Sequence, residues 1–206
     1  MSLDYMGIDY SQSDEQAAIF GALAEAGVSE GRFLDIGAGD GETYSNTRAL
    51  ALAGWQGVCV EPAAWAFAKL LDLYDGTDVR CCSAVVTAET CGPMTFLYTQ
   101  DDHLSTVEPE HAEVWSGVPF KTTTAAAFTV AQLLDWFELG ASVVSIDAEG
   151  RTNEIVRAYS QHPAWEQVDV ICYEREDFRH AGATHLVPPF QLVAETPNNL
   201  IYRRAR

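Results

Sequence analysis

The stretch FLDIGAGDGETYSNT, Phe33 to Thr47, decides the fold of this chain. It opens with the apolar residues of a short strand, passes Asp35, and then places glycines at the alternate positions Gly37, Gly39 and Gly41 before a helical pattern. Glycines in such a place let the backbone turn sharply and approach a ligand closely. A strand, a glycine-rich turn and a helix in this order predict an α/β fold with a ligand site at the turn.

Strand and helix patterns alternate on both sides of this turn. Apolar residues at helical spacing predict an N-terminal helix within residues 13–27. The other predicted helices cover residues 46–53, 63–74, 130–137 and 151–159, and the predicted strands cover residues 32–36, 57–60, 79–86, 94–98, 142–146 and 168–173, with a terminal hairpin at 191–194 and 199–202. This alternation predicts one domain over residues 1–206, with a doubly wound, mostly parallel sheet whose ligands lie outside the carboxyl ends of the strands.

One segment breaks the alternation. Residues 99–124 show no clear periodicity and carry His103, His111 and Trp115. A long irregular segment inside a regular domain is often functional. We interpret residues 99–124 as an insertion or lid that varies with the substrate.

Composition excludes several classes of function. The 206 residues hold 12 Lys and Arg against 30 Asp and Glu, a formal net charge of -18. A protein this acidic is not expected to bind nucleic acid or an anionic membrane. We find no apolar run long enough to span a bilayer, no secretory signal pattern, and five cysteines without metal-binding spacing. These features predict a cytoplasmic protein with reduced thiols and no zinc.

The acids around the glycine turn favour one cofactor over another. A dinucleotide site prefers G-x-G-x-x-G, whereas here the third glycine comes one residue early and Glu42 takes its place. Carboxylates at Asp35, Asp40 and Glu42 would repel a pyrophosphate but attract S-adenosylmethionine, which carries a net positive charge. Glu61 ends the next predicted strand, where an acid commonly binds the ribose hydroxyls. The sequence therefore predicts S-adenosylmethionine as the cofactor.

Three blocks of sequence resemble a known family. FLDIGAGDGETYSNT, GWQGVCVEP (Gly54 to Pro62) and VVSIDAEG (Val143 to Gly150) are similar, in order and spacing, to motifs of the FkbM family of S-adenosylmethionine-dependent methyltransferases. The resemblance implies a class I methyltransferase (Rossmann-like) fold with a seven-stranded sheet and an antiparallel C-terminal strand. It also implies O-methylation of a hydroxyl on a small molecule or sugar. Together with the turn and Glu61, the matching motif positions give the predicted cofactor-binding set, namely Asp35, Gly37, Gly39, Gly41, Asn46, Glu61, Pro62 and Asp147.

Two acids follow the predicted strand 142–146. Asp147 and Glu149 would lie beside the methyl group, where one carboxylate could hold the acceptor or the cofactor ammonium and the other could act as base. His103, in the irregular segment, is a third catalytic candidate. We predict no metal, although the two acids could instead share a divalent cation with Glu174. Alternatively, the two acids could have only a structural role and cap the N-terminus of the helix that begins near Gly150.

Two other functions stay open. A dinucleotide-dependent oxidoreductase is disfavoured by the glycine spacing and the crowded acids. A domain that binds S-adenosylmethionine without catalysis is compatible with the same cofactor residues. The sequence indicates neither the acceptor nor the oligomeric state.

Overall fold

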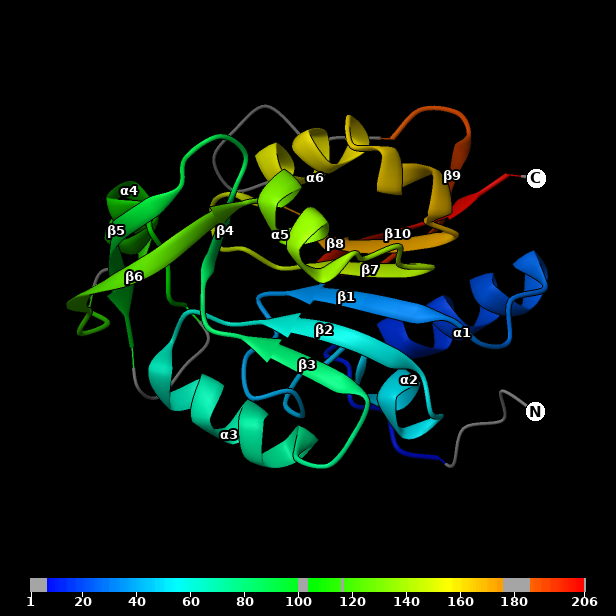
Figure 1. Cartoon of the computed structure of the whole chain (residues 1–206), viewed down its shortest axis with the longest axis horizontal. Coiled ribbons are helices and arrows are strands. Elements are labelled where there is room, and N and C mark those ends of the chain that lie inside the picture. The colour runs from blue at the N-terminus through cyan, green and yellow to red at the C-terminus, as the bar shows by residue number, and fades with distance from the viewer. Residues whose placement is uncertain (1–6, 100–103, 116, 176–185, 206) are drawn as a thin grey trace.

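The computed structural model describes residues 7–99, 104–115, 117–175 and 186–205. In this part of the chain a central sheet has seven strands in the order β3-β2-β1-β7-β8-β10-β9 (Figure 1). Its strands are β1 (Arg32–Ile36), β2 (Gln56–Val60), β3 (Val79–Cys82), β7 (Val143–Ile146), β8 (Val170–Glu174), β9 (Phe190–Glu195) and β10 (Asn199–Arg204). The neighbours from β3 to β8 pair in parallel, whereas β10 is antiparallel to β8 and to β9. The predicted mostly parallel sheet with an antiparallel C-terminal strand is confirmed.

Helices cover both faces of this sheet. The described helices are α1 (Glu15–Ala26), α2 (Arg48–Leu52), α3 (Ala64–Tyr74), α4 (Pro109–Val114), α5 (Val130–Phe137), α6 (Thr152–Ser160) and the 3₁₀ helix η1 (Pro163–Gln167). Helices α5 and α6 lie on one face, and α2 and α3 lie on the other (Figure 1). Among the described helices, none is long and apolar enough to cross a membrane.

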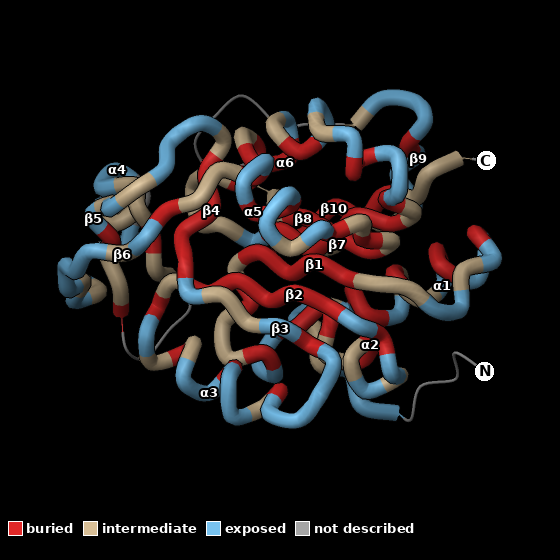
Figure 2. The backbone as a smooth tube through the Cα atoms, viewed as in Figure 1, coloured by how far each residue is buried: buried red, intermediate tan, exposed pale blue. Residues whose placement is uncertain are grey.

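Side chains that alternate between the two faces of the central strands form two buried apolar layers, one on each side of the sheet. In β1, Leu34 and Ile36 pack with residues of α5 and α6, whereas Phe33 packs with residues of α1, α2 and α3. Successive side chains of a strand point to opposite faces, so a strand buried on both sides is apolar throughout. Figure 2 shows that the central strands are buried along most of their length. Asp35 has the same parity as Phe33, so its carboxylate belongs to the α2 side of the sheet.

Two predicted boundaries were wrong. The helix predicted at 46–53 begins only at Arg48. The hydroxyl of Ser45 accepts hydrogen bonds from the backbone N–H groups of Thr47 and Arg48, and this turn precedes the helix. The strand predicted at 79–86 is two strands, β3 and β4 (Val85–Thr87), in different sheets. The chain changes partner between them, from β2 to β6, and an apolar run cannot reveal such a change.

A second, smaller sheet has the order β4-β6-β5, with β5 (Gly92–Tyr98) antiparallel to β6 (Lys121–Thr129). It lies at one end of the molecule, next to α4 (Figure 1). The irregular segment predicted at 99–124 therefore contains α4 and the beginning of β6. Residues 121–124 of β6 are all exposed, so this part of the strand lacks the apolar alternation that would reveal it. The lid itself remains a prediction.

Candidate functional site

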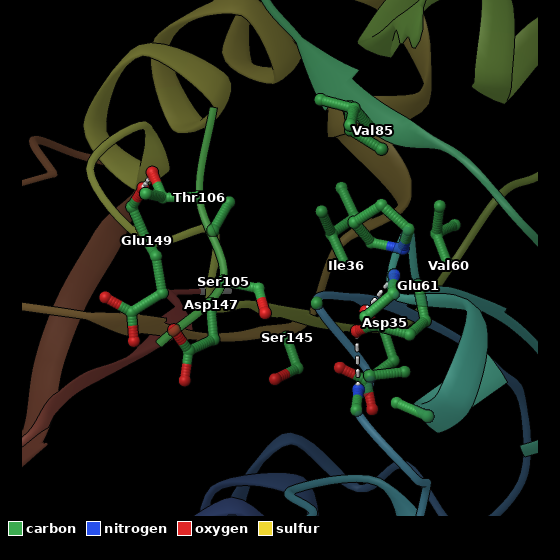
Figure 3. Close-up of a pocket in the computed structure, with 18 of the residues that line it drawn as sticks. Asp35, Ile36, Val60, Glu61, Val85, Ser105, Thr106, Ser145, Asp147 and Glu149 are labelled. Atoms are coloured by element: carbon green, nitrogen blue, oxygen red, sulfur yellow. Dashed lines mark hydrogen bonds between the residues drawn. The ribbon is translucent and has the colours of Figure 1, made fainter. Parts of the chain in front are cut away.

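A cavity of about 370 Å³ opens at the carboxyl ends of β1, β2 and β7. Its volume is sufficient for a small organic ligand. The predicted site residues among its lining are Asp35, Gly37, Gly39, Asn46, Glu61, Pro62, Asp147 and Glu149. Figure 3 shows Asp147 and Glu149 on one side of the cavity, Asp35 and Glu61 on the other, and Ser145 between them. The fold thus brings most of the predicted site together. His103 lies outside the described residues.

The glycine turn is fixed from two directions. The backbone N–H groups of Gly37 and Ala38 donate to the carbonyl oxygen of Val60, at 3.0 and 3.1 Å. Gly37 has a φ of 80°, and a Cβ atom there would lie 1.7 Å from the carbonyl oxygen of Asp147. No residue with a side chain fits this place without moving the backbone. The close approach requires a glycine at position 37.

Gly41 has a different task. It does not line the cavity, and a Cβ atom there would lie 2.6 Å from Cδ1 of Leu70 in α3. Its φ of 79° also favours glycine. Gly41 therefore shapes the turn and lets α3 pack closely behind it. Direct contact with a cofactor remains a prediction for Gly37 and Gly39.

Glu61 follows β2 and is 7% exposed. Its two carboxylate oxygens accept hydrogen bonds from the backbone N–H groups of Gly39 (2.9 Å) and Ala63 (2.7 Å). Burial raises the pKa of Glu61 to about 7, although these two hydrogen bonds oppose the rise. The arrangement locks the carboxylate between the turn and the start of α3. Its remaining lone pairs can accept hydrogen bonds from a pair of ligand hydroxyls.

A buried polar network lies beneath the turn. The hydroxyl of Thr47 donates to Oδ2 of Asp35 at 2.6 Å, and Nδ2 of Asn46 donates to Oγ of Ser145 at 3.2 Å. Ser145 in turn hydrogen-bonds to Asp35. Burial raises the pKa of Asp35 to about 6, and the hydrogen bonds from Thr47 and Ser145 limit the rise. Asp35 therefore organises the floor of the cavity and remains one of its lining residues.

The second acidic group is built on the loop after β7. The N–H of Asp147 donates to the carbonyl oxygen of Ile36 at 2.8 Å, which holds the loop against β1. One carboxylate oxygen each of Asp147, Glu149 and Glu174 lies within 4.8 Å of the others. Asp147 is an exposed residue at the cavity, but desolvation of its carboxylate and the charge of Glu149 raise its pKa. A group of this kind favours a ligand cation, either an ammonium or a divalent metal.

Neither acid is the N-cap of the helix that follows. The N-cap of α6 is Arg151, and it makes no side-chain capping hydrogen bond. The hydroxyl of Thr152 instead accepts a hydrogen bond from the N–H of Ala148 (3.0 Å) and contacts Oε2 of Glu174 (3.4 Å). Asp147 and Glu149 thus precede the helix in a loop that Thr152 closes. The helix-cap interpretation of the two acids is not supported.

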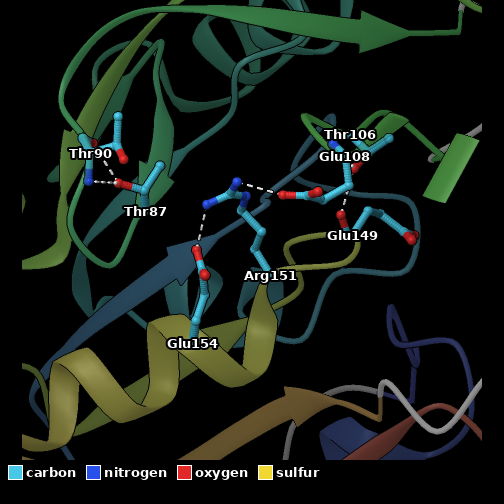
Figure 4. Close-up of polar contacts among 7 residues, drawn as sticks. All are labelled: Thr87, Thr90, Thr106, Glu108, Glu149, Arg151 and Glu154. Atoms are coloured by element: carbon cyan, nitrogen blue, oxygen red, sulfur yellow. Dashed lines mark hydrogen bonds and ion pairs between the residues drawn. The ribbon is translucent and has the colours of Figure 1, made fainter. Parts of the chain in front are cut away.

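A segment that we name the strap, Leu104–Glu108, contributes one wall of the cavity through its residues 104–107. Thr106 exchanges two backbone hydrogen bonds with Leu97 of β5, and its hydroxyl donates to the carbonyl oxygen of Glu149 at 2.7 Å. Arg151 forms ion pairs with Glu108 (2.5 Å) and Glu154 (2.7 Å), and lies between them in Figure 4. The strap therefore joins the small sheet to the acidic loop.

Sequence reasoning missed several lining residues. Ser145 lies near the carboxyl end of β7, two residues before Asp147 in the loop that follows, so its place at this edge of the sheet could have been inferred. Arg151 adds a cation to the wall, and Gln12 and Asn199 come from the two ends of the chain. No local pattern places Gln12, Asn199 or the strap at the cavity, because the topology of the sheet brings them there.

Comparisons with known proteins bear on the fold. No protein-family model matches the chain, and no curated protein matches its sequence. Among solved structures, the hypothetical protein TTHA0928 from Thermus thermophilus has a TM-score of 0.50 and 15% identity, over 100% of this chain and 94% of that chain. The candidate methyltransferase yhhF from Escherichia coli has a TM-score of 0.46 and 14% identity, over 98% of this chain and 92% of that chain.

The candidate methylase HI0767 from Haemophilus influenzae has a TM-score of 0.47 and 14% identity, over 93% of this chain and 88% of that chain. At such identities a likeness concerns the fold alone. The strand order, together with the likeness to TTHA0928, defines the fold of the chain as Rossmann-like α/β. The cavity lies where this architecture commonly binds ligands, at the carboxyl ends of the parallel strands.

Proposed function

We propose that the protein is an S-adenosylmethionine-dependent methyltransferase of the FkbM type that methylates a hydroxyl of a small molecule or sugar. The single observation that carries this proposal is the position of Glu61. Its carboxylate is locked by Gly39 and Ala63 at the end of β2 and lines the cavity beside the glycine turn. This is the place from which an acid binds the ribose of a nucleoside cofactor.

The start of α2 favours this cofactor over a dinucleotide. A dinucleotide site places its pyrophosphate at a helix N-terminus directly after the glycine turn. Here α2 begins only at Arg48, and Asp40 intervenes. The carboxylate of Asp40 accepts hydrogen bonds from the N–H groups of Glu42 and Thr43, at 3.1 and 2.8 Å. An anion at this turn would meet a carboxylate in place of helix N–H groups.

The charge of the cavity supports the same choice. Among the described residues, the acids and bases that line it are Asp35, Glu61, Asp147 and Glu149 and one cation, Arg151. Arg151 is already paired with Glu108 and Glu154. A ligand that carries an ammonium and a sulfonium is attracted by such a wall, whereas a pyrophosphate is repelled.

The chemistry asks little of the protein beyond positioning. S-adenosylmethionine supplies an activated methyl group when bound. The residues of this chain would hold the ribose at Glu61, exclude water with the strap, and orient the acceptor near Asp147. The pKa of Asp147 is raised, and a carboxylate with a raised pKa is, when ionised, a stronger base for an acceptor hydroxyl than an ordinary aspartate. We propose Asp147 for this task, with Glu149 as its neighbour.

Titration calorimetry tests the cofactor. S-adenosylhomocysteine should bind with micromolar affinity, about −8 kcal/mol, and NAD should bind poorly or not at all. Comparable binding of NAD would reject the proposal in favour of an oxidoreductase. A screen of hydroxylated acceptors with S-adenosylmethionine then separates an enzyme from a binding domain, since only the enzyme accumulates S-adenosylhomocysteine above an acceptor-free control.

A further inference from the structure

Asn199 has a position that its place in the sequence does not suggest. It is the first residue of β10, it is 5% exposed, and it lines the cavity. Its backbone pairs with that of Glu174 at the end of β8. Because paired residues of neighbouring strands point to the same face, Asn199 and the acid Glu174 share one side of the sheet. The side chain therefore belongs to the acidic part of the site.

The orientation of the Asn199 carboxamide is set by a residue behind it. Nδ2 of Asn199 donates to Oε1 of Glu15 at 3.1 Å, and the hydroxyl of Thr196 donates to the same oxygen at 2.6 Å. Burial opposes ionisation of Glu15, but these hydrogen bonds outweigh it and hold its pKa below the ordinary value. An ionised carboxylate only accepts hydrogen bonds, so it selects the NH₂ group of the carboxamide.

The other end of this carboxamide has no partner. Oδ1 of Asn199 is a buried oxygen without a hydrogen bond in the described residues. Oδ1 of Asn46, which also lines the cavity, is in the same state, while its Nδ2 is committed to Ser145. A buried acceptor without a donor is costly, so each of these oxygens requires a partner that the described residues do not supply, either water or a ligand.

The surroundings define the chemistry of that partner. Glu15 and Glu174 adjoin Asn199, and Asp147 lies close to Glu174. A donor that approaches an acceptor oxygen among three carboxylates is favoured if it carries positive charge. A primary ammonium meets both conditions, because it has three N–H donors and a full charge. A hydroxyl would meet only the first.

We propose that Oδ1 of Asn199 accepts a hydrogen bond from the α-ammonium group of the amino-acid end of S-adenosylmethionine. The inference rests on the proposed function. It assigns a cofactor contact to β10, the last strand in the sequence, and makes Glu15 of α1 the residue that orients this contact. A carboxamide suits the position better than a carboxylate, because Asp at position 199 would face the ionised Glu15 without a donor between them.

A comparison of two ligands tests this contact without an acceptor. The ligands are S-adenosylhomocysteine and its desamino analogue, which keeps the carboxylate but lacks the ammonium. Affinities are measured by calorimetry for the wild-type chain, Asn199→Leu and the smaller Asn199→Ala, with folding checked by circular dichroism. Asn198→Leu is the matched control, since the Asn198 side chain contacts Ser13 and does not line the cavity.

The wild-type chain and Asn198→Leu should bind S-adenosylhomocysteine at least about tenfold more tightly than the desamino analogue, as one hydrogen bond to a charged group allows. In the folded Asn199 variants this preference should fall by about the same factor, with little change for the desamino analogue. Equal losses for both ligands, or an unchanged preference, would overturn the assignment. Failure of the wild-type chain to bind S-adenosylhomocysteine would instead reject the proposed function.

Discussion

Gly37 and Asp147 meet through their backbones, since a Cβ atom on Gly37 would lie 1.7 Å from the carbonyl oxygen of Asp147. The N–H of Asp147 also donates to the carbonyl oxygen of Ile36, the residue before the glycine. The turn that would hold the cofactor and the loop that would act on the acceptor are therefore placed by the same contact. A shift of one loop must displace the other.

Gly37→Ala should disrupt both loops. The substitution introduces a backbone clash in addition to the strain of a residue with a φ of 80°. We expect the free energy of unfolding to fall by more than about 2 kcal/mol, together with loss of S-adenosylhomocysteine binding. Gly54→Ala is the matched control, because Gly54 has a φ of 87° but nothing within 4 Å of its Cβ position. Equal losses of stability in the two variants would show that the contact with Asp147 is unimportant.

Glu61→Ala should weaken the binding of S-adenosylhomocysteine by about 1.5–3 kcal/mol, the usual value of hydrogen bonds to a charged group. Calorimetry on the folded variant measures the change. Glu25→Ala, at an exposed position of α1 that does not line the cavity, should bind like the wild-type chain. A dissociation constant unchanged by Glu61→Ala would mean that the carboxylate only holds the turn.

The buried acids predict how stability depends on pH. Burial raises the pKa of Glu61 from 4.5 to about 7 and that of Asp35 from 3.8 to about 6. The folded chain thus holds these protons more tightly than the unfolded chain. The stabilisation is fully present below the unfolded pKa values and is lost as the pH rises through about 6 to 7. Glu61 alone should contribute a decrease on the order of 2–3 kcal/mol.

Urea denaturation of the ligand-free chain between about pH 5 and pH 8 measures this decrease. Glu61→Gln should flatten the dependence, whatever its effect on absolute stability. Glu89→Gln, at an exposed position, should keep the wild-type slope. Asp35 should leave a smaller slope in Glu61→Gln, whereas a slope equal to that of the wild-type chain would assign the effect to other groups.

Asp147→Asn tests the proposed base. If Asp147 takes the acceptor proton, the variant should retain most of its affinity for S-adenosylhomocysteine and lose about 10²–10⁴-fold in turnover. If Asp147 holds the cofactor ammonium, affinity and turnover should fall together. A folded variant with near-normal affinity and turnover would contradict both roles. The binding half of the experiment needs no acceptor.

Thr106→Val tests the strap. The hydroxyl of Thr106 donates to the carbonyl oxygen of Glu149 and accepts from the N–H of Glu108. Valine keeps the shape of the side chain but removes both hydrogen bonds in a residue that is 2% exposed. We expect the free energy of unfolding to fall by about 1–3 kcal/mol. Thr106→Ser keeps the hydroxyl and should lose less; an equal loss would assign the effect to the missing methyl group.

Sequence periodicity predicted the main sheet well because its strands are buried on both faces. Their apolar runs are short and end at Gly, Asp or Glu, so β1, β2, β7 and β8 were found with small boundary errors. The same reasoning failed at the small sheet. Residues 121–124 of β6 are exposed, and β4 continues the apolar run of β3 while pairing with a different strand. Pairing partners are set by tertiary structure, and periodicity does not encode them.

The candidate site was predictable where acids or glycines follow a predicted strand in the sequence. Asp35, the glycines, Glu61 and Asp147 all stand at strand ends, and the parallel sheet brings strand ends together. Asn199 and Gln12 stand at no such landmark and reach the cavity from the two ends of the chain. Gly41 carries the same motif signal as Gly37 but packs against α3, so a motif position alone does not distinguish ligand contact from packing.

The ladder between β5 and β6 pairs Gly92 with Ala127 and Tyr98 with Lys121. The polypeptide that carries α4 and the strap therefore leaves the small sheet after Tyr98 and returns to it at Lys121, so its two ends adjoin. An excursion with adjoining ends can lengthen, shorten or be exchanged between related chains while the side of the cavity that carries Asp35 and Glu61 keeps its geometry. Under the proposed function, acceptor preference would then diverge during evolution independently of cofactor use, and grafting residues 92–127 would be a direct route to redesigning it.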